Sequence, residues 1–135
     1  AGHDSSFPDA DFFLMRAAEA YLIYAEADAR MNGGTTTTDG AQYINALRSR
    51  AHATTHTAYS LRQICDEWSR EFYFEGLRRT TLIRFGYFGG NVNYNWSWKG
   101  GVKNGRNFDA HLNLFPIPSS DLTANGNLVQ NQGYN

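Results

Sequence analysis

The sequence contains few of the residue patterns that mark common functional sites. Its 135 residues include one cysteine, Cys65, so an internal disulfide bond is impossible, and no CxxC spacing predicts a metal site. The 12 basic and 13 acidic residues give a net charge of −1, which provides no basic surface for nucleic acid. No apolar run approaches the roughly 18 residues of a transmembrane helix. These absences leave a globular protein of one domain's length, with no cofactor and no metal predicted.

The chain also lacks a signal peptide and a phosphate-binding loop. Residues 1–9 are polar, and an amphipathic segment follows almost at once, so we expect a piece of a longer protein. The glycines at 100, 101 and 105 lack the strand before them and the helix after them that a phosphate loop requires.

Four helices are predicted in the first two thirds of the chain, which indicates a mainly α fold. Their sequences are rich in strong helix formers, and Ser60 with Gln63 has the spacing of a capping box. The predicted helices span residues 11–32, 39–53, 60–75 and 77–85. Helices paired in this order form tetratricopeptide-like hairpins. Because two hairpins are too few for a stable repeat array, we expect them to pack on a further part of the protein.

The remaining residues, 87–135, predict a long irregular region. They are rich in glycine and asparagine, and the prolines at 116 and 118 favour an extended path. Aromatic residues are concentrated in the first part of this region: Tyr87, Phe88, Tyr94, Trp96, Trp98 and Phe108. Loops of this length are uncommon in compact domains and are often functional. The chain, residues 1–135, is therefore predicted to be a portion of a single domain. Its helical hairpins span about 11–86, and an irregular loop and tail span 87–135.

Four short motifs follow one another along almost the whole chain. They are RAAE with LIYAEA (residues 16–19 and 22–27), NALRSRA (45–51), EWSREFYFEG with LIRFG (67–76 and 82–86), and LFPIP with NLVQNQGY (114–118 and 127–134). In this order and spacing they resemble the C-terminal part of SusD/RagB-family proteins. The sequence departs from the family pattern at Thr81, usually aspartate, at Phe85, often tryptophan, and at Gly126 and Gln132, usually prolines.

This resemblance implies a nutrient-binding protein of a bacterial outer membrane. SusD/RagB proteins are mainly helical, non-catalytic lipoproteins of Bacteroidetes that bind oligosaccharides, and sometimes peptides, for uptake through a SusC-like TonB-dependent transporter. They are several times longer than this chain, and their lipidated cysteine lies at the mature N-terminus, so Cys65 is not that residue. The resemblance thus implies a cell-surface location, an upstream N-terminal part of the same protein and no enzymatic activity. Most sugar-binding residues of the family lie upstream, and none is carried over here.

The aromatic stretch at 87–111 is the one place where the residues themselves suggest binding. Flat aromatic side chains pack against the apolar faces of sugar rings, and amides pair with hydroxyl groups. The candidate ligand-binding residues are Tyr94, Trp96, Trp98, Asn93 and Asn95. In a strand, Trp96 and Trp98 would point to the same side. The alternative is that the aromatics form a structural lid over the helices.

The carboxylates Glu67, Glu71 and Glu75 are spaced to lie along one helix face, where paired carboxylates can serve glycoside hydrolysis. Arginines close in sequence and on the other predicted hairpin favour a structural network of ion pairs instead. These arginines are Arg48, Arg50, Arg70, Arg78, Arg79 and Arg84.

The other candidate groups favour structural roles. His52 and His56 are four residues apart but have no evident third ligand, and Cys65 has no recognisable base nearby. We therefore expect a non-catalytic protein that binds an oligosaccharide and delivers it to the transporter. Two alternatives remain: a helical module that docks the transporter or a peptide, and a glycosidase that uses Glu71 and Glu75.

Overall fold

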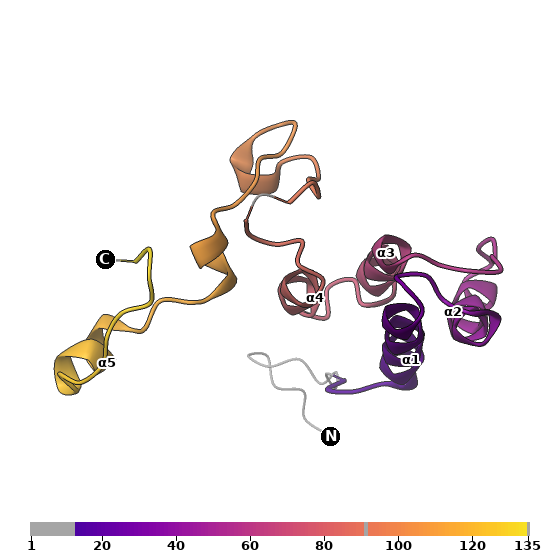
Figure 1. Ribbon diagram of the computed structural model, residues 1–135, viewed down its shortest axis with the longest axis horizontal. Coiled ribbons are helices and arrows are strands. Elements are labelled where there is room, and N and C mark those ends of the chain that lie inside the picture. Colours follow the sequence, from indigo (N-terminus) through magenta and orange to yellow (C-terminus); the bar gives the residue numbers. More distant parts are fainter. Residues whose placement is uncertain (1–12, 91, 135) are drawn as a thin grey trace, which may run out of the picture. The chain divides into compact units, whose positions relative to one another are not determined.

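The chain is mainly helical, as its sequence predicts. The computed structural model describes residues 13–90 and 92–134 (Figure 1). Over these residues the elements are α1 (Ala17–Met31), α2 (Thr38–Arg50), α3 (Leu61–Glu71), α4 (Arg78–Arg84), the 3₁₀ helices η1 (Lys99–Gly101) and η2 (Ala110–Asn113), and α5 (Ser119–Ala124). Extended pairing in this part of the chain is limited to two isolated bridges, Thr35 with Ser60 and Gly89 with Phe108. None of the described helices has the length and apolarity to cross a bilayer.

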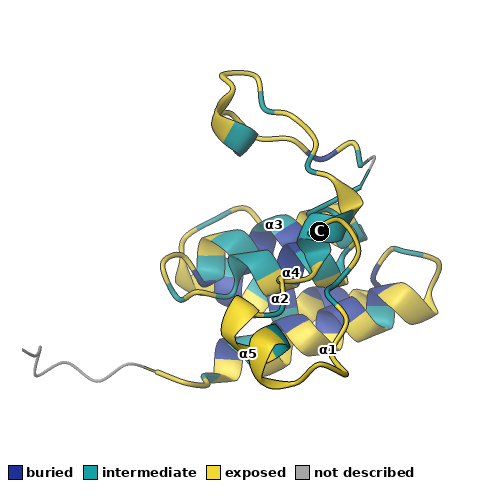
Figure 2. Cartoon of the chain, turned by 90° about the vertical axis from the view of Figure 1, so that its left-hand side faces the viewer, coloured by how far each residue is buried: buried dark blue, intermediate teal, exposed yellow. Residues whose placement is uncertain are grey.

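Two compact units divide the chain, Ala1–Glu67 and Trp68–Asn135. The boundary predicted near residue 86, between helices and irregular tail, falls inside the second unit. Buried residues concentrate in the helices, whereas most residues of the tail are half-buried or exposed (Figure 2).

In the first unit, α1 and α2 pack against each other as a helical hairpin joined by residues 32–37. Their buried apolar side chains include four alanines among seven: Ala18, Leu22, Ala25, Ala29, Ala41, Ile44 and Leu47. The carboxylate of Asp28 on α1 accepts hydrogen bonds from the backbone N–H of Thr37 (2.6 Å) and from its hydroxyl (2.9 Å). A Cβ atom on Gly40 would collide with this carboxylate. A glycine at position 40 therefore lets the start of α2 approach α1 closely.

Three helix ends differ from the predicted bounds by three residues or more. The helix predicted from residue 11 begins at Ala17, and residues 13–16 are not helical, while residues 11 and 12 lie outside the described part. α2 ends at Arg50 instead of 53, and His52 adopts a left-handed φ of +54°. α3 ends at Glu71 instead of 75, because Phe74 (φ +63°) and Gly76 (φ +78°) turn the chain away from helical geometry.

Two side-chain interactions predicted from the sequence stabilise α3, one at its start and one within it. The capping box is confirmed: the Ser60 N–H donates to Gln63 Oε1 (2.8 Å), and the Gln63 N–H donates to Ser60 Oγ (3.3 Å). The predicted ion pairing is confirmed for one carboxylate, since Arg48 Nη1 donates to Glu67 Oε2 at 2.8 Å. This ion pair joins α2 to α3 within the first unit.

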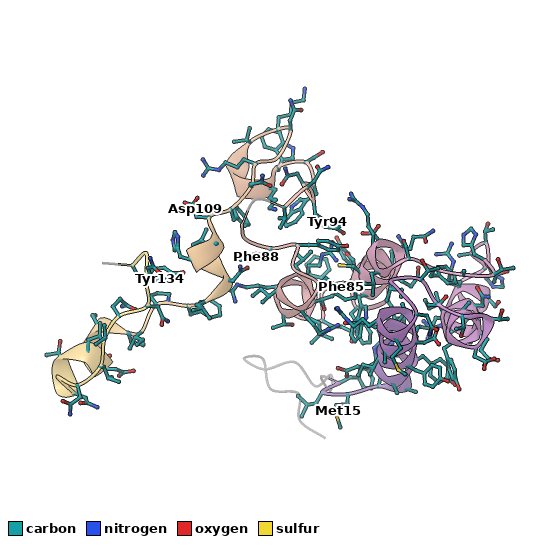
Figure 3. All side chains as sticks on the ribbon, in the orientation of Figure 1. Met15, Phe85, Phe88, Tyr94, Asp109 and Tyr134 are labelled. Carbon is teal, nitrogen blue, oxygen red and sulfur yellow. The ribbon has the colours of Figure 1, made fainter. Side chains whose placement is uncertain are left out.

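Side-chain amides hold the irregular part of the second unit together. Asn113 forms a two-way pair with the backbone of Gly89 (3.0 and 3.3 Å), and Gln130 forms a similar pair with Ile117 (2.8 and 2.9 Å). The hydroxyl of Tyr134, labelled in Figure 3, donates to the carbonyl oxygen of Leu114 (2.8 Å). These bonds take the place of a strand ladder, which the described residues of the tail do not form.

Candidate functional site

The aromatic stretch of the second unit forms a compact turn. Its backbone closes through hydrogen bonds from the N–H of Arg106 to the carbonyl of Lys99 (3.1 Å), and from the N–H of Trp98 to the carbonyl of Lys103 (3.3 Å). Gly105, with φ of +73°, lies so close to the carbonyl oxygen of Trp96 that a Cβ atom would collide with it. A glycine is therefore required at position 105 to close this turn.

Lys99 lies at the centre of the turn and is only 1% exposed. Its ammonium group donates to the carbonyl oxygen of Tyr94 (3.1 Å) and lies 5.0 Å from the ring centre of Trp96 and 5.1 Å from that of Phe108. Aromatic rings attract a cation through their negative faces, which compensates part of the lost hydration. Burial nevertheless lowers the pKa of Lys99 below its ordinary value of 10.5. Lys99 therefore contacts the backbone and two aromatic rings from the interior of the turn.

The structure places the five predicted ligand-binding residues in one short segment but gives them different exposures. Trp98 is 66% exposed and Trp96 is 39% exposed, and Asn93 and Asn95 are exposed as well. Tyr94 is only 6% exposed. The two tryptophans and two asparagines are therefore accessible to a ligand, whereas the tyrosine is enclosed.

Tyr94 is enclosed by neighbours in its own unit. Its ring stacks on Tyr87 with a centroid distance of 4.7 Å and an interplanar angle of 4°, and it meets the Trp96 ring in a T-shaped arrangement with a centroid distance of 6.4 Å. Arg78 donates to its hydroxyl oxygen at 2.8 Å. Figure 3 labels Tyr94 at the base of the aromatic turn. Tyr94 therefore anchors the turn to α4 and supports Trp96.

Trp96 and Trp98 do not lie in a strand, although a strand is what would make them point to the same side. Residues 97–98 form a turn, and Trp98 has a left-handed φ of +68°. The alternation of side chains in a strand therefore does not apply here.

A second aromatic cluster connects α4 to the tail. The guanidinium of Arg79 lies 3.8 Å from the ring centre of Phe115 and 4.9 Å from that of Phe88, and it donates to the carbonyl oxygen of Leu112 (2.7 Å). The sequence predicts that Arg79 pairs with carboxylates. Its described partners are instead aromatic faces and a backbone oxygen, because the tail returns to α4 at this point.

The carboxylates do not form the predicted row. α3 ends at Glu71, so Glu75 lies beyond the helix, and the expectation that Glu67, Glu71 and Glu75 share one helix face is wrong for Glu75. Glu67 is buried and paired with Arg48. His52 and His56 are exposed, Cys65 is fully buried, and the described residues contain no cluster of three or more groups that could hold a metal ion.

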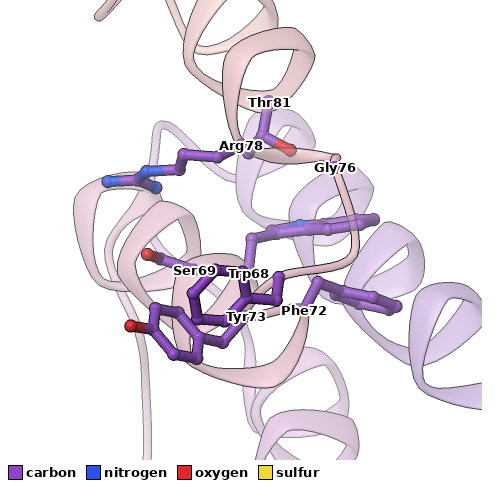
Figure 4. A pocket seen from close by; sticks show the side chains of 8 residues that line it. Trp68, Ser69, Phe72, Tyr73, Gly76, Arg78 and Thr81 are labelled. Carbon is purple, nitrogen blue, oxygen red and sulfur yellow. The ribbon is translucent and has the colours of Figure 1, made fainter.

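A pocket of about 400 Å³ lies at the turn between α3 and α4, and no sequence pattern indicates it. Its lining residues are Trp68, Ser69, Phe72, Tyr73, Phe74, Gly76, Arg78 and Thr81 (Figure 4). From the sequence alone, the motif aromatics Tyr24, Trp68, Phe72 and Phe74 are predicted to be core residues. Trp68 and Phe72 are buried, at 3% and 5% exposure, but the prediction is wrong for Tyr24, which is 47% exposed, and for Phe74, which is 88% exposed. The left-handed backbone at Phe74 turns this side chain outward, and sequence patterns do not reveal such a turn.

Comparison with known proteins identifies one family. The family model of the SusD family matches residues 1–134. The starch-binding protein SusD of Bacteroides thetaiotaomicron is 47% identical over 131 residues, which are 96% of this chain and 23% of that protein. A solved SusD superfamily protein from Bacteroides vulgatus is 28% identical, with a TM-score of 0.65, over 90% of this chain and 28% of that one. Another, from Parabacteroides distasonis, shares the fold at 23% identity, with a TM-score of 0.69, over 97% of this chain and 29% of that one. The chain thus spans less than a third of the length of these relatives.

Proposed function

Because the chain belongs to the SusD family, we propose that it is the C-terminal part of a non-catalytic, glycan-binding lipoprotein of a bacterial outer membrane. The whole protein binds an oligosaccharide at the cell surface and passes it to a SusC-like TonB-dependent transporter. The likeness to a starch-binding relative carries this proposal and favours an α-glucan as the ligand class. The lipid anchor lies on the upstream part.

Within this chain, the accessible side of the aromatic turn is the surface that fits a sugar. Trp98 exposes a large flat ring, and Trp96 is partly exposed beside it. Such rings pack against the C–H face of a sugar, and the exposed amides of Asn93 and Asn95 offer donors and acceptors for hydroxyl groups. Lys99 and Tyr94 support this surface from beneath through Trp96.

The arrangement of the carboxylates supports a binding role over glycoside hydrolysis. Hydrolysis requires two carboxyl groups on either side of the scissile bond, about 5–10 Å apart. Glu67 is held in an ion pair with Arg48, and Glu71 and Glu75 are separated by the end of α3. We therefore propose passive capture of the ligand without chemical change.

The test is a calorimetric titration of the longer protein that contains this sequence with soluble malto-oligosaccharides and with other glycans as comparisons. The titration is repeated with Trp98→Ala, with Trp96→Ala/Trp98→Ala and with Val102→Ala as a matched control. Val102 is 45% exposed in the same turn but carries no ring. Loss of a stacked aromatic residue should weaken binding about two- to tenfold, since ring contacts contribute about 0.5–1.5 kcal/mol, whereas Val102→Ala should bind normally.

The outcomes separate the two parts of the proposal. Binding that all variants retain would place the sugar site elsewhere in the protein and leave the aromatic turn as a structural lid. A folded protein that binds none of the glycans would contradict the capture function itself.

A second candidate, a docking module for the transporter or for a peptide ligand, is favoured by the surface of the first unit. α1 and the segment before it expose several large apolar side chains: Leu14, Met15, Tyr21, Ile23, Tyr24 and Met31. Apolar surface of this kind marks contact sites on proteins. A protein that binds no glycan but is retained by the transporter, with retention lost on Ile23→Asp, would favour this role.

A further inference from the structure

The turn after α5 brings the side-chain amide of Asn125 close to the backbone of the next residue. Residues 125–128 form this turn, which is closed by a hydrogen bond from the N–H of Leu128 to the carbonyl oxygen of Asn125 (3.0 Å). The amide oxygen Oδ1 of Asn125 also accepts a hydrogen bond from the N–H of Asn127 (3.1 Å), which folds the side chain over the peptide group that joins Asn125 to Gly126. All four residues are exposed, so water reaches this amide freely.

An asparagine followed by glycine can lose its amide group without an enzyme, and asparagine is accordingly a thermolabile residue. The backbone nitrogen of the glycine attacks the side-chain carbon Cγ, a C–N bond forms, and the amide nitrogen leaves as ammonia with the proton of the glycine N–H. Water then opens the resulting succinimide ring at either carbonyl, which gives aspartate or isoaspartate. The reaction requires only water, an N–H that is free to react and a side chain within its reach.

Two of the three Asn-Gly pairs in this chain are restrained by hydrogen bonds. The pairs lie at residues 32–33, 104–105 and 125–126. The N–H of Gly105 donates to the carbonyl oxygen of Val102 (2.8 Å), so the attacking nitrogen is engaged. The amide nitrogen of Asn32 donates to the carbonyl oxygen (2.7 Å) and to the carboxylate (3.3 Å) of Asp28, and ammonia can leave only after both bonds break. Both pairs therefore resist the reaction.

Asn125 and Gly126 have neither restraint. Among the residues that the structure describes, the N–H of Gly126 has no acceptor and the amide nitrogen of Asn125 has no partner. Negative charge develops on Oδ1 when the nitrogen adds to Cγ, and the N–H of Asn127 is already bonded to this oxygen. A donor fixed in this position lowers the barrier, as in an oxyanion hole. A Cβ atom on Gly126 would meet no atom within 4 Å, so the turn has room to bend as the ring closes.

We propose that Asn125 is a site of spontaneous modification, which converts it through a succinimide to aspartate or isoaspartate in the folded protein. Either product adds a negative charge, and isoaspartate also lengthens the backbone by one methylene group. The segment around α5 is closed at its base by the bonds of Gln130 to Ile117 (2.8 and 2.9 Å) and of Asn131 to Phe115 (2.7 Å). The rest of the tail therefore keeps its path when the turn changes.

The residue at position 126 decides whether this reaction is possible. It is the second residue of the turn, a position that favours proline, and proline is what the SusD/RagB pattern usually has here. Proline has no backbone N–H, so it cannot form the neutral succinimide. Asn125 already has an extended backbone (φ −132°, ψ 98°), as is preferred before proline. The turn should therefore accept Gly126→Pro, whereas the reaction cannot proceed through it.

The test incubates the longer protein that contains this sequence in mildly alkaline buffer, which favours attack by the backbone nitrogen. Peptide mapping by mass spectrometry follows the gain of one mass unit at each asparagine over time, and fragmentation by electron transfer separates isoaspartate from aspartate. Asn32 and Asn104 serve as internal controls. Gly126→Pro is the matched variant, and Gly126→Ala, which keeps the N–H but adds a methyl group that hinders the attack, serves if the proline variant does not fold.

Asn125 should be converted about two- to tenfold faster than Asn104, the factor that one hydrogen bond of ordinary strength contributes, and isoaspartate should be among the products. Gly126→Pro should stop the conversion at position 125, Gly126→Ala should slow it, and neither should alter the rate at Asn104. Conversion at Asn125 that is no faster than at either control, or that is unchanged in both variants, would overturn the proposal. The proposal does not depend on glycan capture, and none of these outcomes bears on that function.

Discussion

Replacing Arg48 should destabilise the first unit strongly, because Arg48 neutralises a buried carboxylate. The side chain of Glu67 is 8% exposed and that of Arg48 is 15% exposed, and their charged atoms lie 2.8 Å apart. Arg48 also donates from Nε to the carbonyl oxygen of Thr54 at 2.6 Å. The change Arg48→Met keeps most of the apolar stem but leaves Glu67 without this cation.

The expected cost is about 3 kcal/mol in the free energy of unfolding. Removal of one partner from a buried pair typically costs about 3–5 kcal/mol. The low end applies because the arginine is partly exposed and because Glu67 makes a further interaction. The bond to Thr54 is included in this figure. Urea denaturation followed by circular dichroism at 222 nm, a wavelength that reports helix, measures the loss.

Two comparisons make this result decisive. Arg50→Met alters an exposed arginine on the same helix and should change stability by no more than about 0.5 kcal/mol. The double variant Arg48→Met/Glu67→Met removes both charges, and it should recover most of the loss, since apolar replacements of buried ion pairs are often neutral. If Arg48→Met costs no more than Arg50→Met, the ion pair does not stabilise the joint between α2 and α3.

Two further predictions concern the aromatic turn. Gly105→Ala should lower the free energy of unfolding by about 2–4 kcal/mol, because it adds a collision with the carbonyl of Trp96 to the strain of a positive φ. Gly101→Ala introduces the strain alone and should lower it by about 1 kcal/mol. Equal losses for the two variants in urea denaturation would contradict the close approach at position 105. Because burial lowers the pKa of Lys99, the unfolded chain binds more protons than the folded chain between that lowered pKa and 10.5, so Lys99 makes stability rise with pH across this window. The stability of the wild type relative to Lys99→Met should therefore increase as pH approaches 10.5, and a difference independent of pH would count against the burial of this ammonium group.

The helices could be predicted from the sequence because their signals are local. Residues with high helix propensity set the positions of α1 to α4, and the capping box needs only Ser60 and Gln63, three residues apart. The end of α3 could not be predicted in the same way. It depends on Phe74 adopting a left-handed conformation, which bulky residues rarely do and which no local pattern marks.

The candidate binding residues were located as a group, but their individual exposures were not predictable. Lysine is rarely buried, so nothing in the sequence indicates that Lys99 would fill the space beneath Trp96. The enclosure of Tyr94 depends on Tyr87 and Arg78, which reach it from outside the turn. Such contacts become visible only when segments distant along the chain are placed in space.

The motifs of the sequence correspond to pairs of contacting segments. Arg48 of NALRSRA meets Glu67 of the EWSREFYFEG motif in the buried ion pair. In the tail, Gln130 of NLVQNQGY bonds both backbone groups of Ile117 in LFPIP, and Asn131 donates to the carbonyl of Phe115 (2.7 Å).

This correspondence has a physical reason that differs between the two units. In a helix the backbone satisfies its own hydrogen bonds, so most surface positions tolerate substitution without loss of the fold. In an irregular tail each buried backbone group depends on a particular side chain, and an amide that both donates and accepts is suited to this task. Replacement of Gln130 by glutamate would keep the acceptor for the Ile117 N–H but lose the donor to its carbonyl oxygen. In the irregular tail, single residues therefore determine the path of the chain. This accounts for specific sequence motifs in a segment that has almost no regular structure.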